Sequence, residues 1–123
     1  MSFAYGPGRP VLEEIDLDVA PGRTVALIGH TGSGKTTLAS LVPRFYDASE
    51  GRVLVDGQDV REVTRRSLRR EIGVISQDPF LFSASVRDNI AFGLLDAPQE
   101  AVERAARAAQ AHAFIEELSL IHI

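Results

Sequence analysis

A glycine-rich segment carries the residues of this sequence whose types and spacing most clearly point to chemistry. Its residues are Gly29, His30, Thr31, Gly32, Ser33, Gly34, Lys35 and Thr36. They match the G-x-x-x-x-G-K-[S/T] pattern of a phosphate-binding P-loop. Glycines let successive backbone N–H groups turn toward one concave face that holds phosphate oxygens. The Lys35 ammonium would reach the β and γ phosphates and the Thr36 hydroxyl would bind Mg²⁺, so the segment predicts a nucleoside triphosphate site.

The flanking residues argue against the alternative, a glycine-rich turn that binds nothing. Residues 24–28 form an apolar run typical of a strand buried on both faces. Residues 37–44 follow with apolar side chains at helical spacing. A phosphate loop needs this order of strand, loop and helix. Lys35 is the only lysine, so the chain has none left for the N-K-x-D segment by which GTP-binding switch proteins recognise guanine.

The other elements are predicted from apolar periodicity, turn residues and helix caps. Further strands are expected at residues 2–5, 14–19 and 72–75, with a hairpin over residues 52–60 about an Asp56–Gly57 turn. Helices are expected at residues 64–70, 85–91, 98–109 and 114–118, with residues 76–83 as a loop. The first part of the chain is therefore mixed α/β and the remainder helical.

Composition bounds the class of protein. The chain has 123 residues, of which 45% are hydrophobic and 24% charged, as in one modest globular domain. It has no cysteine, which excludes disulfides and thiolate zinc sites. Its formal charge is −4, and the arginines of residues 61–70 are interleaved with glutamates, so we expect no nucleic acid partner. No apolar run approaches the ~20 residues that cross a bilayer.

Several motifs, taken in order, resemble the nucleotide-binding domain of ATP-binding cassette (ABC) transporters of the exporter type. The matching blocks are residues 3–5, 29–37, 44–47, 51–57, 76–83 and 86–90. The resemblance implies an α/β P-loop NTPase core, with a mixed sheet and an antiparallel β part, at residues 1–84. It also implies the start of a helical subdomain at residues 85–118, whereas residues 119–123 form a tail unlike the family.

The resemblance assigns further roles, one residue at a time. Tyr5 would stack on the adenine of ATP, and Thr37 would add a hydroxyl to the phosphates. Gln77 would act in catalysis together with Lys35, and would bind Mg²⁺ together with Thr36. The region from Gln77 to Phe82 would dock on the transmembrane domain of the transporter. A second nucleotide-binding domain would complete a dimer at the cytoplasmic face of the cell membrane.

The family pattern continues beyond what this sequence contains. The L-S-G-G-Q signature, the Asp-Glu pair of Walker B and the switch histidine are expected after Leu118 and do not occur. We therefore expect a truncated fragment that binds ATP, does not hydrolyse it and is poorly soluble, whereas the intact parent is an ATPase. The alternative is a non-hydrolytic nucleotide-binding or regulatory module. Asp56 imitates a metal-binding aspartate after an apolar strand, but we interpret it as a turn residue.

Overall fold

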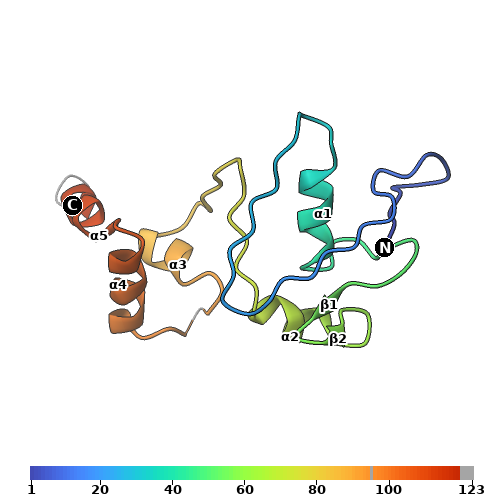
Figure 1. The fold of residues 1–123 in the computed structure, drawn as a ribbon. Coiled ribbons are helices and arrows are strands. Elements are labelled where there is room, and N and C mark those ends of the chain that lie inside the picture. The colour runs from blue at the N-terminus through green and yellow to red at the C-terminus, as the bar shows by residue number, and fades with distance from the viewer. Residues whose placement is uncertain (95, 120–123) are drawn as a thin grey trace. The chain divides into compact units, whose positions relative to one another are not determined.

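The computed structural model describes residues 1–94 and 96–119, and the chain divides into two compact units, Met1–Val74 and Ile75–Ile123 (Figure 1). The first unit contains α1 (Lys35–Leu41), β1 (Leu54–Val55), β2 (Gln58–Asp59) and α2 (Arg65–Arg70). The second contains α3 (Val86–Ile90), α4 (Gln99–Ala108) and α5 (His112–Ser119). The described residues thus contain both helices and strands, as the α/β fold class requires, and both strands lie in the first unit. Beyond Ser119, the expected tail lies outside the described residues.

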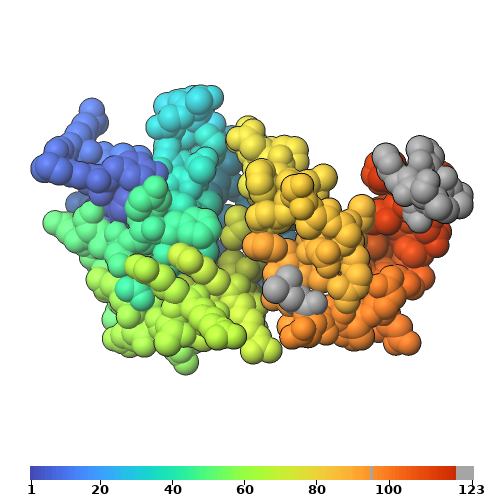
Figure 2. All heavy atoms as spheres, turned by 180° about the vertical axis from the view of Figure 1, so that it is seen from behind, coloured from blue at the N-terminus to red at the C-terminus, as the bar shows by residue number. Residues whose placement is uncertain are grey.

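The core of the first unit joins segments that are far apart in the sequence. Phe3, Leu12 and Leu41 are its buried residues. The Phe3 N–H donates to the carbonyl oxygen of Leu12 at 2.9 Å, and the Ser2 N–H donates to that of Glu50 at 2.9 Å. Figure 2 shows the N-terminal segment, in blue, against a segment coloured green. The start of the chain is thereby fixed beside α1, which carries Leu41.

The predicted hairpin is confirmed. β1 and β2 are antiparallel, with Leu54 opposite Asp59 and Val55 opposite Gln58. The two turn residues both have positive φ, 50° at Asp56 and 78° at Gly57. A two-residue hairpin turn of the primed type needs this conformation, which aspartate tolerates and glycine adopts freely. Asp56 is therefore a turn residue, as its sequence context predicts.

The prediction of strands at residues 14–19, 24–28 and 72–75 is wrong for the chain as the structure describes it. These segments have no strand assignment, and Ser2 and Phe3 form only isolated bridges. The physical reason is that a strand exists only with a partner, and in the described residues β1 and β2 are the only paired strands. Many of the apolar side chains in these segments are consequently exposed, Ile28 to 94%, whereas Ile15 and Ile72 are half-buried.

The predicted helices are present, with bounds shifted by a few residues. Thr64 caps α2, because its hydroxyl accepts the Ser67 N–H at 3.2 Å, and Ser85 caps α3 by accepting the Asp88 N–H at 3.1 Å. In the second unit, Ala91, Ala97 and Val102 form a small buried core. Among residues 1–94 and 96–119, no helix is long and apolar enough to cross a membrane.

Candidate functional site

The glycine-rich loop enters α1 through backbone conformations that favour glycine. In Figure 1 it is the turn that leads into the N-terminal end of α1. Gly32 has a φ of 82°, and Gly34, the residue before the helix, has a φ of 88°. A Cβ at Gly34 would lie 2.7 Å from Cδ2 of Leu12, and one at Gly29 would lie 2.6 Å from Oγ of Ser33. The positive φ at Gly32 and Gly34 therefore favours glycine, and at Gly29 and Gly34 an added side chain would also displace a neighbouring one.

The Lys35 ammonium lies over this loop and holds it closed. Its Nζ donates to the carbonyl oxygens of Gly29 and His30, each at 2.7 Å, and to Oγ of Ser33 at 3.2 Å. The His30 ring nitrogen Nδ1 lies 2.9 Å from the carbonyl oxygen of Thr31. A single positive charge is thus centred on a loop of backbone groups at the start of a helix. This arrangement suits a phosphate chain.

The two threonines that follow Lys35 have different environments. Thr36 is exposed, so its hydroxyl is open to a ligand. Thr37 is only 7% exposed, and its Oγ1 lies 3.0 Å from the hydroxyl oxygen of Tyr5. In the described part of the chain, no group of three or more His, Asp or Glu residues is placed to hold a metal. A single hydroxyl fits Mg²⁺, which keeps several waters and takes its other ligands from substrate phosphates.

Tyr5 reaches the loop although it lies 32 residues from Thr37 in the sequence. Its ring contacts those of Phe3 and Tyr46, with centroids 4.9 Å and 5.1 Å apart and ring planes at 83° and 88°. Tyr5 nevertheless remains 58% exposed. The fold therefore brings a supported, accessible aromatic ring to the helix that carries Lys35, Thr36 and Thr37.

Gln77 lies in the second unit, on the exposed loop that precedes α3. Its role toward the nucleotide stays a prediction. The side chains that follow it, Phe80, Leu81 and Phe82, are apolar and exposed. The ring of Phe82 stacks on that of Phe92 with their centroids 4.2 Å apart, a contact that no sequence pattern indicates. Asn89 fixes the loop, since its Oδ1 accepts the Phe82 N–H at 2.7 Å and its Nδ2 donates to the Phe82 carbonyl at 3.1 Å.

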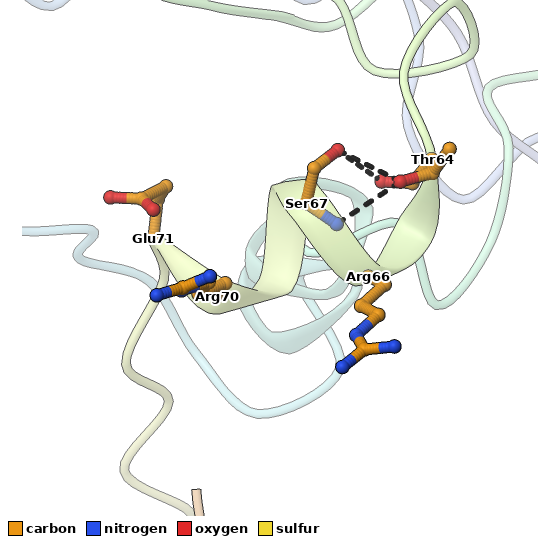
Figure 3. A pocket seen from close by; sticks show the side chains of 5 residues that line it. All are labelled: Thr64, Arg66, Ser67, Arg70 and Glu71. Carbon is orange, nitrogen blue, oxygen red and sulfur yellow. Dashed lines mark hydrogen bonds between the residues drawn. The ribbon is translucent and has the colours of Figure 1, made fainter. Parts of the chain in front are cut away.

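A shallow hollow of about 410 Å³ on α2 contains none of the predicted site residues (Figure 3). It is lined by Thr64, Arg66, Ser67, Arg70 and Glu71, all of them exposed. Thr64 and Ser67 are joined by the hydrogen bonds of the helix cap, including one from Ser67 Oγ to the Thr64 carbonyl at 2.9 Å. These polar groups start a helix, and the candidate site remains the loop before α1.

Comparison with known proteins decides the family. The family model described as ABC transporter matches residues 12–123. The chain belongs to the ABC transporter family. This member is 50% identical over 116 residues to the putative multidrug export ATP-binding/permease protein YgaD of Bacillus subtilis, covering 94% of the chain and 20% of that protein. It is 48% identical over 118 residues to the ATP-dependent lipid A-core flippase of Syntrophus aciditrophicus, covering 96% of the chain and 20% of that protein.

A solved structure of an ABC exporter is also similar to this ABC transporter chain. A bacterial Atm1-family ABC exporter with ATP bound has a TM-score of 0.85 and 42% identity to it, covering 92% of the chain and 20% of that exporter. The chain therefore spans about a fifth of the length of its relatives. It corresponds to ABC ATPase sequence, and the P-loop of this family binds nucleotide.

Proposed function

We propose that the chain is the ATP-binding part of an ABC exporter, in which ATP binding and hydrolysis drive transport of a substrate across a membrane. The observation that carries the proposal is the Lys35 ammonium, centred on a glycine loop at the start of α1 by bonds of 2.7 Å to two carbonyls. This geometry supports phosphate binding, because a cation beside the loop would neutralise charge on the β and γ phosphates of a nucleotide held there. The names of the exporter relatives support the wider role.

Each residue of the loop has a part in holding the nucleotide. Gly29, Gly32 and Gly34 shape the loop, and the backbone of His30, Thr31 and Ser33 completes it. Lys35 neutralises phosphate charge, the Thr36 hydroxyl binds Mg²⁺, and the Thr37 hydroxyl adds a bond to phosphate. Mg²⁺, when bound, neutralises charge on the β and γ phosphates. Tyr5 offers its exposed ring to adenine, a contact that tolerates any base.

Gln77 and the apolar side chains after it belong to a second function, contact with the transmembrane part. We infer that the face from Gln77 to Phe82 docks on the transmembrane domain and that Gln77 orients the attacking water or binds Mg²⁺. The exposed Phe80 and Leu81 support docking, because apolar patches of this kind mark interaction sites. We also infer that the chain pairs with a second nucleotide-binding domain at the cytoplasmic face of the membrane.

The segments at residues 24–28 and 72–75 would be strands of a mixed sheet in the complete domain. Their apolar composition suits a sheet interior. The TM-score of 0.85 to the Atm1-family exporter supports a shared backbone path. Partner strands from the rest of the domain would supply the missing hydrogen bonds.

Replacement of Lys35 tests the proposal in the full-length exporter. We expect Lys35→Ala to lower the rate of ATP hydrolysis by about a hundredfold or more, since a preorganised charge at the transferred phosphate is lost. The matched control is Arg66→Ala, which removes one positive charge from the exposed face of α2 and should stay within twofold of wild type. Turnover of Lys35→Ala within twofold of wild type would refute the assignment. ATP binding without turnover in the wild type would instead favour a non-hydrolytic nucleotide-binding module.

A further inference from the structure

Three aromatic rings of the first unit form a cluster, which we call the Tyr5 cluster and define as Phe3, Tyr5 and Tyr46. The ring of Tyr46 lies with its centroid 5.1 Å from that of Tyr5 at an interplanar angle of 88°, and 5.6 Å from that of Phe3. Phe3 is 3% exposed and belongs to the core, whereas Tyr5 and Tyr46 are both about half exposed. The cluster is thus anchored at Phe3 and opens to solvent at the two tyrosines.

Tyr5 is held at three places. Its ring contacts Phe3 and Tyr46, and its hydroxyl forms the 3.0 Å hydrogen bond with Oγ1 of Thr37. Perpendicular aromatic pairs have a preferred geometry, because the positive ring edge is attracted to the negative ring face. An exposed ring with one support would rotate among its allowed side-chain conformations. Three supports restrict Tyr5 to one orientation, with more than half of the residue still accessible.

Tyr46 itself stands on a fixed piece of backbone. It follows the turn that ends α1, in which the Phe45 N–H donates to the Ser40 carbonyl at 3.0 Å. The Arg44 guanidinium ties this turn to the rest of the unit through bonds to Asp47 Oδ1 at 2.7 Å and to the Val60 carbonyl at 3.1 Å. The backbone that carries Tyr46 is therefore anchored within the first unit.

We propose that Tyr46 is a positioning residue for the nucleotide base, which orients the ring of Tyr5 for stacking without contacting the phosphates. This inference rests on the proposed function, in which Tyr5 stacks on adenine. Preorganisation of this kind raises affinity, because the conformational entropy of the ring is already lost before the nucleotide binds. The bond between Tyr5 and Thr37 places the same ring in register with the phosphate loop.

The experiment separates base recognition from phosphate recognition. Affinities of the full-length protein for Mg-ATP and for magnesium tripolyphosphate, which has no base, are measured by calorimetry for wild type and variants. We expect Tyr46→Ala to weaken ATP binding about fivefold, as loss of an aromatic pair predicts, and to leave tripolyphosphate binding within twofold. Tyr46→Phe is the matched control, because it keeps the ring contacts, and should bind both probes within twofold of wild type.

Tyr5→Ala is the reference for the size of the effect in Tyr46→Ala. Loss of the stacking ring should weaken ATP binding by about tenfold or more and leave tripolyphosphate binding unchanged. If Tyr5→Ala behaves so and Tyr46→Ala binds ATP like wild type, the positioning role is wrong and the proposed function stands. If Tyr46→Ala weakens the binding of both probes equally, the effect is purely structural and the positioning role is also wrong. If Tyr46→Ala does not fold, Tyr46→Leu keeps the bulk without the ring and is expected to show the same selective loss. If Tyr5→Ala leaves ATP binding unchanged, base stacking on Tyr5 and its positioning by Tyr46 are both refuted.

Discussion

Asp59, the last residue of β2, shows how a single ion pair is set by local geometry. Oδ2 of Asp59 accepts a bond from Nη2 of Arg61 at 2.7 Å, and its Oδ1 accepts from the Arg61 side chain at 3.1 Å and backbone N–H at 2.9 Å. These bonds to the charged form lower the pKa of Asp59 from 3.8 to about 2. The Arg61 side chain is 43% exposed, so solvent screens the pair and its effect on stability is small.

The depressed pKa gives a prediction of pH dependence. The unfolded carboxyl takes up its proton near pH 4, and the folded one only near pH 2, so this stabilising contribution is present above pH 4 and is lost as the pH falls toward 2. We expect carboxyl carbon NMR to give a titration midpoint near 2 for Asp59. Arg61→Ala should raise the midpoint toward 3.8, whereas Arg66→Ala should leave it unchanged. An Asp59 midpoint that is insensitive to Arg61→Ala would contradict the ion-pair explanation.

At the scale of elements, the junction between the phosphate loop and α1 combines backbone conformation with packing. Gly32 and Gly34 share a positive φ, but only Gly34 faces the core, where Leu12 is buried. The two glycines therefore separate the cost of backbone strain from the cost of a steric clash.

Alanine substitution at each glycine measures these two costs. Gly32→Ala has open space for its methyl group, so we expect only the conformational cost of about 1–2 kcal/mol. Gly34→Ala adds a contact of 2.7 Å to Leu12 Cδ2 and should be destabilised further, with weaker nucleotide binding. Denaturant unfolding measures the free energy of unfolding of both variants. Equal values would show that the Leu12 side chain moves aside without loss of stability.

At the scale of the whole molecule, several apolar segments of the described chain have no partner strand and expose their side chains to solvent. Val25, Leu27 and Ile28 of the first unit are exposed, and Ile75 of the second unit is fully exposed. Unpaired extended segments offer both backbone hydrogen bonds and apolar side chains to another chain. We therefore expect the isolated chain to self-associate.

We expect light scattering of the purified 123-residue chain to show self-association that grows with concentration. Ile28→Ser should reduce it, because it removes the most exposed side chain of the 24–28 segment. Arg23→Ser, an exposed substitution just before the segment, is the matched control and should change little. A monomer that unfolds cooperatively in denaturant would contradict this prediction.

The features that the sequence predicted correctly are those decided by neighbours along the chain. The cap at Thr64, the turn at Asp56 and Gly57, and the loop before α1 each depend on a few consecutive residues, and the structure contains all three. The strand at residues 24–28 is predicted from its continuous apolar run, with no partner strand identified. Pairing depends on a second segment that composition does not supply, so this prediction was wrong for the described chain.

The sequence by itself determined the nucleotide chemistry, because the glycines, lysine and threonine of the P-loop pattern all lie within eight consecutive residues, Gly29 to Thr36. Only the tertiary structure decided which distant residues join that loop. Tyr5 meets Thr37 across 32 residues, and Tyr46 meets Tyr5 because the turn after α1 folds back toward the N-terminal segment. Such contacts arise from burial of Phe3 and Leu41 in a shared core, which no local pattern encodes.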